Sequence, residues 1–205
     1  MAKRLFDLLA SGLGLLLLAP VLLAMAIAIK LDSPGPVFFR QVRVGRHGVE
    51  FRIHKFRTMV HWDTTAEAAT AQLTVGAAPR ITRVGALLRR TKLDELAQLI
   101  DVFAGRMSLV GPRPEVPRYV ALYPAVLRDK VQSVRPGITD PASLAFRDES
   151  ARLARAADPE REYVEVVMPA KLQLSARYVD EASFRGDLRL IAATLRALWI
   201  RNPAS

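Results

Sequence analysis

The stretch "LLASGLGLLLLAPVLLAMAIAI", Leu8 to Ile29, runs without one charged residue. A helix crosses the hydrocarbon of a bilayer with about 20 apolar residues, so this run is long enough. A secretory signal peptide has a shorter apolar core of about 7–15 residues, and the core helix of a soluble protein is seldom apolar on every face. The sequence therefore predicts a membrane-embedded helix over residues 1–31, followed by a second domain over residues 32–205.

The flanks of this run indicate how it sits in the membrane. Pro20, near its middle, lacks an N–H, and its ring clashes with the carbonyl of Leu16. Because basic flanks prefer the cytoplasmic side, both ends favour the same side of the bilayer. We therefore expect a break at Ala19–Pro20 and a re-entrant helix; the alternative is a kinked helix that spans the membrane. The basic flanking residues are Lys3 and Arg4 before the run and Lys30, Arg40, Arg43 and Arg46 after it.

The charge balance of the chain indicates what kind of partner it binds. The chain has 205 residues, with 30 Lys and Arg against 20 Asp and Glu, and a formal net charge of +10. Such a balance favours an anionic partner: nucleic acid, an acidic lipid surface or a phosphorylated substrate. The absence of Cys excludes disulfides and thiolate metal sites.

Beyond the membrane segment, apolar and basic residues partly alternate in "VFFRQVR" (37–43) and "VEFRIHKFR" (49–57). This pattern, on either side of "GRHG", predicts a β-hairpin. Residues 61–79 are predicted to form a loop with a short helix. Two later segments, "MSLVGPRPE" (107–115) and "VRPGIT" (134–139), are predicted to be irregular loops because they contain adjacent Gly and Pro.

The remaining segments favour helices, which makes the predicted fold a mostly helical α/β fold. One short helix is expected over residues 80–91, and a second one carries Asp94 and Glu95 and ends at Gly105. The C-terminal third is predicted to be helical from 159 to 182, with an interruption at Pro169, and again from 187 to 200. Leucines share one face of this last helix, with Trp199 and Arg201 near its end, so it either lies on lipid headgroups or packs on the core.

The segment "RRTKLDELAQLID", residues 89–101, places two acids side by side at a predicted helix start. Thr91 can act as an N-cap with Asp94 three residues later, in a variant of the capping box. The same acids can perform chemistry, because an aspartate can attack a phosphoryl group and form an acyl-phosphate. Adjacent helical residues point about 100° apart, so both acids reach one site only from the first turn. Asp94 and Glu95 are therefore candidate catalytic residues and candidate ligands of a metal such as Mg²⁺.

Basic residues recur beside turns, loops and helix starts elsewhere in the chain. Arginine offers a planar fork to phosphate oxygens, and lysine offers a point charge. Each of these residues taken alone is more often a solvated surface cation, but their recurrence makes them candidate phosphate-binding residues. They are Lys55, Arg57, Arg89, Arg90, Arg113 and Arg135.

The order and spacing of these motifs resemble the bacterial sugar transferase family, the monotopic polyprenol-phosphate phosphoglycosyl transferases. The resemblance covers essentially the whole chain. It rests on the apolar N-terminal segment, "KFRTM" (55–59), "RRTKLDELAQLIDVFAGRMSLVGPRPE" (89–115) and "VRPGIT". The chain is similar to minimal members, which consist of the catalytic unit alone.

This resemblance implies a reaction in two steps at the cytoplasmic face of the bacterial inner membrane. Asp94 matches the nucleophile that attacks the β-phosphate of a UDP-sugar, and Glu95 matches the second acid, which positions the metal or the acceptor. Undecaprenyl phosphate then accepts the phosphosugar. Lys55, Arg89 and Arg113 match phosphate-binding positions of the family, and we add Arg57 and Arg135 from their place beside loops.

The resemblance also implies Mg²⁺ as the ion and membrane phospholipids as the surroundings. It gives no reason to expect nucleic acid as a partner and leaves a homodimer open. The chain departs from the family pattern in two places. Ala19–Pro20 stands where the family usually has Ser-Pro, and "DPASLAFRDE" (140–149) stands where many members have a Trp-Ala-Gln-Val-Asn-Gly run.

Three other functions compete with this interpretation. A membrane-tethered nucleic-acid binder would explain the net charge, but it would gather its cations on one face beside exposed aromatic residues. A non-catalytic scaffold of the same fold would have no need of the adjacent acids. Within enzymes, the chain could hydrolyse its donor or transfer to another lipid phosphate.

Overall fold

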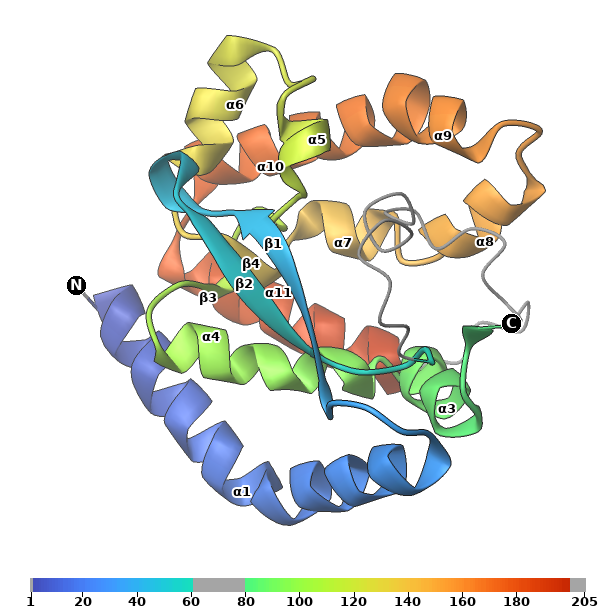
Figure 1. Cartoon of the computed structure of the whole chain (residues 1–205). Helices are drawn as coiled ribbons and strands as arrows, with labels where there is room; N and C mark the ends of the chain where they lie inside the picture. Colours follow the sequence, from blue (N-terminus) through green and yellow to red (C-terminus); the bar gives the residue numbers. More distant parts are fainter. Residues whose placement is uncertain (1, 61–79, 200–205) are drawn as a thin grey trace.

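The computed structural model describes residues 2–60 and 80–199. The loop predicted at 61–79 lies outside the described residues. So do Arg201 and the side chain of Trp199, which the sequence placed near the end of the last helix. Helix α1 lies along one side of the molecule and helices α9 and α10 along the opposite side (Figure 1). A β-hairpin runs between them. The mostly helical fold expected from the sequence, with its small sheet region, is confirmed.

Helix α1 (Ala2–Asp32) contains Pro20 and stays helical through it. Figure 1 shows that α1 changes direction near its middle. The break predicted at Ala19–Pro20 is thus a bend within a continuous helix, which is the usual effect of a proline that removes one backbone hydrogen bond.

The surface of α1 is apolar and open. Among the described helices it is the one long and apolar enough to cross a membrane, and only 11% of its most apolar window is buried. A core helix of a soluble protein would be mostly buried. Leu9, Leu16 and Leu31 are all more than half exposed, so α1 presents an apolar surface suited to lipid.

Polar contacts fix the N-terminal arm of α1 to the rest of the chain. Asp7 is 3% exposed and accepts hydrogen bonds from the Ser108 hydroxyl at 2.8 Å and the Leu109 N–H at 3.1 Å. The Lys3 ammonium donates to the Val110 carbonyl at 2.9 Å and forms an ion pair with Asp187. A buried carboxylate with two donors is well satisfied, so this arm is held in a defined place.

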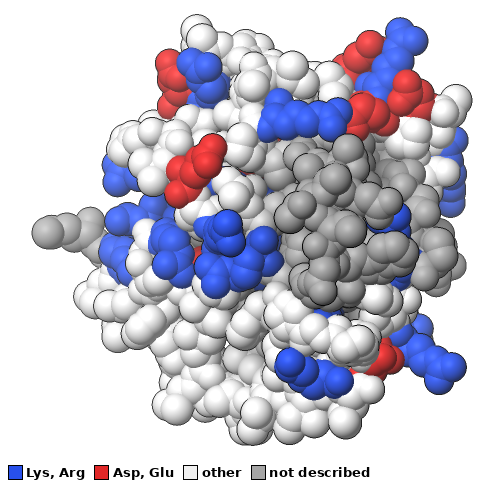
Figure 2. Space-filling model, viewed as in Figure 1, with Lys and Arg blue, Asp and Glu red and all other residues white. Residues whose placement is uncertain are grey.

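The predicted hairpin is confirmed. Strands β1 (Phe38–Val44) and β2 (Glu50–Phe56) pair antiparallel along their whole length. They are joined by the short helix η1 (Arg46–Gly48). Figure 2 shows Lys and Arg side chains gathered over this hairpin, whereas the part of the surface formed by α1 is largely free of charge.

The helices around the paired acids differ from the prediction in detail. Helix α3 (Arg83–Thr91) ends at Thr91, and its C-cap residue Lys92 adopts the left-handed conformation with φ 58°. The 3₁₀ helix η3 (Leu93–Gln98) and helix α4 (Leu99–Phe103) follow. The N-cap predicted for Thr91 is wrong, because its hydroxyl donates back to the Leu87 carbonyl at 2.8 Å and so closes α3 instead of opening η3.

The two Gly/Pro segments predicted as irregular loops form a short parallel pair, which uses the start of 107–115 and the end of 134–139. Strand β3 (Ser108–Val110) pairs with β4 (Gly137–Thr139). A Cβ atom on Gly137 would lie 2.1 Å from the backbone nitrogen of Gly111. Glycine is therefore required where the two chains touch backbone to backbone.

Short helices connect these segments to a long C-terminal pair. The interruption predicted at Pro169 is not a break: the chain stays helical from 159 to 181, and Pro169 lies in the first turn of α10, just after the π-helical turn η4. The helices are α5 (Pro117–Val120), α6 (Ala125–Gln132), α7 (Pro141–Ala145), α8 (Glu149–Arg155), α9 (Pro159–Glu162), η4 (Tyr163–Val167), α10 (Met168–Glu181) and α11 (Phe184–Trp199). One face of α11 packs on β3, β4 and α7, as the core alternative predicts, whereas Leu188, Leu195 and Leu198 remain exposed.

Two apolar clusters hold the site in place. The first joins α1 to β2, α3 and η3 through buried residues such as Ile29, Phe56 and Ala97. The second joins β2, α4 and the start of β3 through Ile53, Val102 and Met107. The strand that carries Lys55 is thus packed against η3, which carries the two acids, in the first cluster and against α4 in the second.

Candidate active site

Glu95 is the centre of a compact ionic cluster. Its carboxylate accepts from the Lys55 ammonium at 3.0 Å and from the Arg113 guanidinium, with one of the latter contacts at 3.0 Å. Burial raises the pKa of Glu95, but the charges of Arg113 and Lys55 outweigh it and hold the pKa well below its usual range. The Glu95 carboxylate also holds the pKa of Arg113 above its ordinary value. Glu95 is therefore ionised and paired.

Asp94 differs from its neighbour in both contacts and acidity. Its carboxylate has no hydrogen bond or ion pair to another residue in the described ranges. Burial raises the pKa of Asp94 and the adjacent charge of Glu95 raises it further, whereas Lys55, Lys92 and Arg89 oppose the rise. Asp94 is thus an unpaired carboxylate surrounded by cations.

The cations around Asp94 come from three elements. Lys55 lies near the end of β2, Arg89 in the last turn of α3, and Lys92 at the junction of α3 and η3. Burial lowers the pKa of Lys55 although Glu95 opposes this, and burial likewise lowers the pKa of Arg89 against the charge of Asp94. Several partly buried cations beside one free carboxylate would attract a ligand with more negative charge than Asp94 supplies.

The loop of Arg113 is fixed by backbone hydrogen bonds. The Gly137 N–H donates to the Pro112 carbonyl at 3.0 Å, and the Val44 N–H donates to the Glu115 carbonyl at 2.9 Å. The loop is thus held between β4 and β1. Its geometry places Arg113 across from Lys55, with Glu95 between them.

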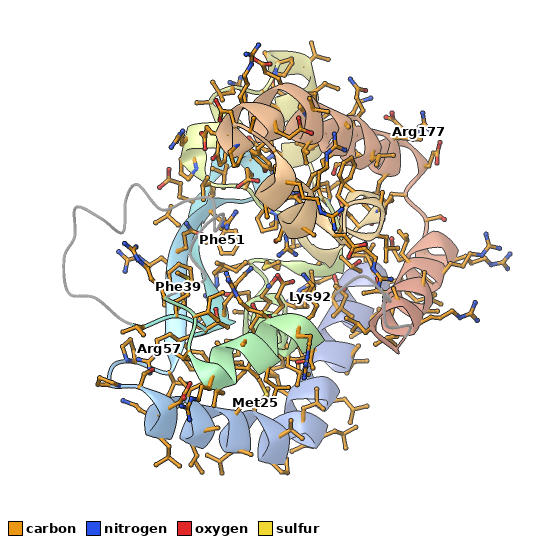
Figure 3. The ribbon with its side chains drawn as sticks, turned by 90° about the vertical axis from the view of Figure 1, so that its right-hand side faces the viewer. Met25, Phe39, Phe51, Arg57, Lys92 and Arg177 are labelled. Carbon is orange, nitrogen blue, oxygen red and sulfur yellow. The ribbon has the colours of Figure 1, made fainter. Side chains whose placement is uncertain are left out.

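Two of the predicted phosphate-binding residues do not join this cluster. Arg57 is 4% exposed and donates to the carbonyls of Ser33 at 2.7 Å and Pro34 at 2.8 Å, so it closes the end of α1. Figure 3 shows Arg57 and Lys92 well apart. Arg135 donates to the Gly105 carbonyl at 2.9 Å, beyond the far end of α4. Both guanidinium groups bind backbone carbonyls, so we do not retain them in the site.

The donor set fits a magnesium ion only in part. Mg²⁺ is commonly held by one or two carboxylates together with substrate phosphates. Asp94 is free for this role, whereas Lys55 and Arg113 occupy Glu95. Within residues 2–60 and 80–199 no group of three metal-binding side chains gathers. Any such ion would therefore depend on Asp94 and on oxygens of the substrate.

One residue of this site was missed from the sequence. Lys92 contributes positive charge at Asp94 and has one of the two positive-φ backbones found among the described non-glycine residues. A basic residue directly before a pair of acids, between two predicted helices, was a signal that could have identified it.

The chain belongs to the bacterial sugar transferase family, because the sequence model of that family matches residues 1–201. A relative from Rhizobium leguminosarum bv. phaseoli, "Exopolysaccharide production protein PSS", is 40% identical over 199 residues, which cover 94% of this chain and 92% of that protein.

Longer relatives carry more specific names. "Undecaprenyl-phosphate glucose phosphotransferase" of Komagataeibacter xylinus is 45% identical over 98% of this chain. "UDP-glucose:undecaprenyl-phosphate glucose-1-phosphate transferase" of Xanthomonas campestris pv. campestris is 40% identical over 94% of this chain. This chain spans 36% and 38% of the length of these two proteins, respectively.

Proposed function

We propose that this protein transfers a phosphosugar from a UDP-sugar to undecaprenyl phosphate, giving a polyprenyl-diphosphate sugar and UMP. Membership in the bacterial sugar transferase family supports this activity. The names of the Xanthomonas and Komagataeibacter relatives support both substrates. The name of the Rhizobium relative supports a place in exopolysaccharide production. The reaction would be the first membrane step of surface-glycan assembly.

The observation that carries the mechanism is the contrast between the two adjacent acids. Glu95 is bound by two cations, and Asp94 is unpaired but surrounded by positive charge. A nucleophile must have a free lone pair, which Asp94 has. A residue that orients phosphate-binding cations must touch them, as Glu95 does. We therefore assign the attack to Asp94 and the positioning of Lys55 and Arg113 to Glu95.

In the first step, a carboxylate oxygen of Asp94 attacks the β-phosphorus of the UDP-sugar. A bond forms between that oxygen and the phosphorus, and the bond from the phosphorus to the bridging oxygen breaks. UMP leaves with the electron pair, and the phosphosugar remains on Asp94 as an acyl-phosphate. Lys55, Arg89 and Arg113 would neutralise the charge on the phosphate oxygens. Mg²⁺, when bound, would supply further charge neutralisation next to Asp94.

In the second step, a phosphate oxygen of undecaprenyl phosphate attacks the same phosphorus. The bond from the phosphorus to Asp94 breaks, and the free carboxylate is restored. A phosphate monoester with a second pKa of about 6 is largely ionised at neutral pH. The acceptor therefore needs no general base, which agrees with the lack of an uncommitted second acid beside Asp94 in the described residues.

We also propose that α1 is re-entrant and that the catalytic domain lies at the cytoplasmic face of the inner membrane. The bend at Pro20 and the exposed leucines of α1 support this arrangement. The basic residues at both ends of α1 favour the same side. The exposed leucines of α11 would rest on the same membrane surface, in the arrangement called monotopic.

The test is UMP release from a panel of UDP-sugars by the purified full chain, with and without undecaprenyl phosphate and Mg²⁺. We expect sustained release from at least one donor only when both lipid and ion are present. A matched pair of variants, Asp94→Asn and the exposed Asp129→Asn, separates specific from general effects. If the wild-type chain released no UMP from any donor, the scaffold interpretation would replace the enzyme.

A further inference from the structure

A cavity lies beside Arg113, and its lining does not include the ionic cluster of Glu95 and Lys55. It is a cavity of about 190 Å³ between the turn of the hairpin, the loop 112–115, α5, α6 and α10. These elements meet in one corner of the molecule (Figure 1). Asp94 and Glu95 do not line it, but Arg113 does. A ligand in the cavity would therefore contact the guanidinium that also binds Glu95, the chain neighbour of Asp94.

Each cation that lines the cavity forms an ion pair with a carboxylate. Arg43 forms an ion pair with Glu115 at 2.8 Å, and Lys171 forms one with Glu149 at 2.6 Å. Arg113 is already bound to Glu95. No lining cation is left without a carboxylate partner, so an anionic ligand would find no uncompensated charge here. This contrasts with Asp94, which lies near Lys55, Lys92 and Arg89 without forming an ion pair with any of them.

The cavity nevertheless offers hydrogen-bonding groups that are free. The Tyr123 hydroxyl and the Gln132 amide line it and have no side-chain hydrogen bond to any residue in the described part of the chain. The Nε of Arg43 is buried without a partner. A buried donor without a partner, such as this Nε, costs free energy and is commonly satisfied by water or a ligand.

The size and the lining suggest the kind of ligand. A cavity of about 150 Å³ holds a benzene ring, so this one can take a six-membered ring together with some of its substituents. Carboxylates, a guanidinium, a phenol and an amide around such a ring can each bind a hydroxyl. A neutral, hydroxyl-rich ring fits this lining better than a phosphate or a purely apolar group.

We propose that this cavity binds the sugar ring of the donor and that Tyr123 and Gln132 help to select it. The proposal rests on the proposed function, since it places the sugar next to the phosphate-binding Arg113. Two further lining residues, Ala142 and Glu149, come from the segment 140–149, where this chain departs from the usual family pattern.

The experiment compares the full chain with Tyr123→Phe and Gln132→Ala. Gln173→Ala on the exposed face of α10 is the matched control. The kcat/KM of UMP release is measured for UDP-sugars that differ in one hydroxyl, and the inhibition constant of UMP is measured in parallel. Loss of one neutral hydrogen bond should lower kcat/KM for the preferred donor about fivefold. The loss should be smaller for donors that lack the contacted hydroxyl, with UMP inhibition unchanged and Gln173→Ala at the wild-type value.

Three kinetic results would overturn the proposal. Weaker inhibition by UMP in the variants would show that the nucleoside occupies the cavity. Equal losses for all donors would show a structural effect, and no loss would show that the cavity takes no part. Saturation-transfer NMR from the protein to the sugar protons of UDP-glucose gives a readout that does not need turnover. If the wild-type chain released no UMP, sugar contacts that weaken in Tyr123→Phe would still support the cavity, and sugar contacts that are absent or unchanged would overturn it.

Discussion

Asp94 and Glu95 are neighbours in the chain, yet their surroundings change their acidities in opposite directions. Burial and the charge of Glu95 raise the pKa of Asp94, whereas Arg113 and Lys55 lower that of Glu95 despite its burial. Two acids with separated pKa values can take different roles at one pH.

Asp94→Asn should abolish UMP release while keeping or raising thermal stability. The folded-state pKa of Asp94 is raised, so above its unfolded-state pKa the ionised group destabilises the fold, and a neutral amide removes that cost. Activity should fall by about a thousandfold or more, as is usual for a lost nucleophile. The measurements are UMP release and thermal unfolding, with Asp129→Asn as control. A variant that is both inactive and clearly less stable would contradict this account.

Glu95→Gln should destabilise the fold by about 2–3 kcal/mol, because it leaves Lys55 and Arg113 without their carboxylate. The pKa of Glu95 is lowered from 4.5, so its stabilisation is fully present above that value and is lost as the pH falls through the folded-state pKa. The stability difference from wild type should stay constant between about pH 5.5 and 7.5 and shrink in acid. Chemical unfolding at several pH values tests this, with the exposed Glu181→Gln as control; a difference that grows in acid would be the wrong sign.

The sequence identified the two acids, Lys55, Arg89 and Arg113 as candidates, but not which cations share a site. Arg57 and Arg135 have the same chemistry and similar loop positions as Arg113 in the sequence. Only the folded chain shows that both donate to backbone carbonyls. A residue pattern identifies a donor, but its acceptor depends on contacts between distant parts of the chain.

At the level of elements, the sequence predicted those helices and strands that depend on interactions between nearby residues. The hairpin and the long helices follow from periodicity and turn residues within about ten neighbours. The parallel pair β3–β4 could not be predicted in this way, because each strand has three residues and its partner lies far along the chain. The cap predicted at Thr91 failed because the hydroxyl found carbonyls in the helix before it.

The bend of α1 should determine on which side of the membrane the N-terminus lies. Because the chain has no Cys, Ala2→Cys provides a single thiol, and Ser150→Cys provides a control in the catalytic domain. We expect neither thiol to react with an impermeant maleimide from the periplasmic side. Adding Pro20→Leu should straighten α1. A fraction of the molecules should then expose the thiol at position 2 to the periplasmic side. Labelling of Ala2→Cys in the presence of Pro20 would show a spanning helix instead.

The contact between α1 and β3 should contribute substantially to stability. Asp7→Ala leaves the Ser108 hydroxyl and the Leu109 N–H without their acceptor. Two buried donors without a partner should cost about 2–3 kcal/mol. Thermal unfolding in detergent measures this, with Asp129→Ala as the exposed control. Equal stability of the two variants would show that the N-terminal arm of α1 is not held by Asp7.

At the scale of the whole molecule, the apolar surface of α1 and the exposed leucines of α11 would bring the catalytic cluster to the membrane, where a polyprenyl phosphate resides. The N-terminal run and the paired acids are separate signals in the sequence. The fold joins them, because α1 packs on the helices that carry the acids. The cavity beside Arg113 was not predictable, since its lining comes from residues between 43 and 175.

The most direct test of the central claim is intact-mass analysis of the full chain after a short reaction with a UDP-sugar and Mg²⁺ but no lipid acceptor. We predict a mass increase equal to one phosphosugar, which is absent in Asp94→Asn and disappears from the wild-type chain when undecaprenyl phosphate is added. Turnover with the lipid but without any adduct, or an adduct that persists in Asp94→Asn, would contradict the assignment of Asp94 as nucleophile.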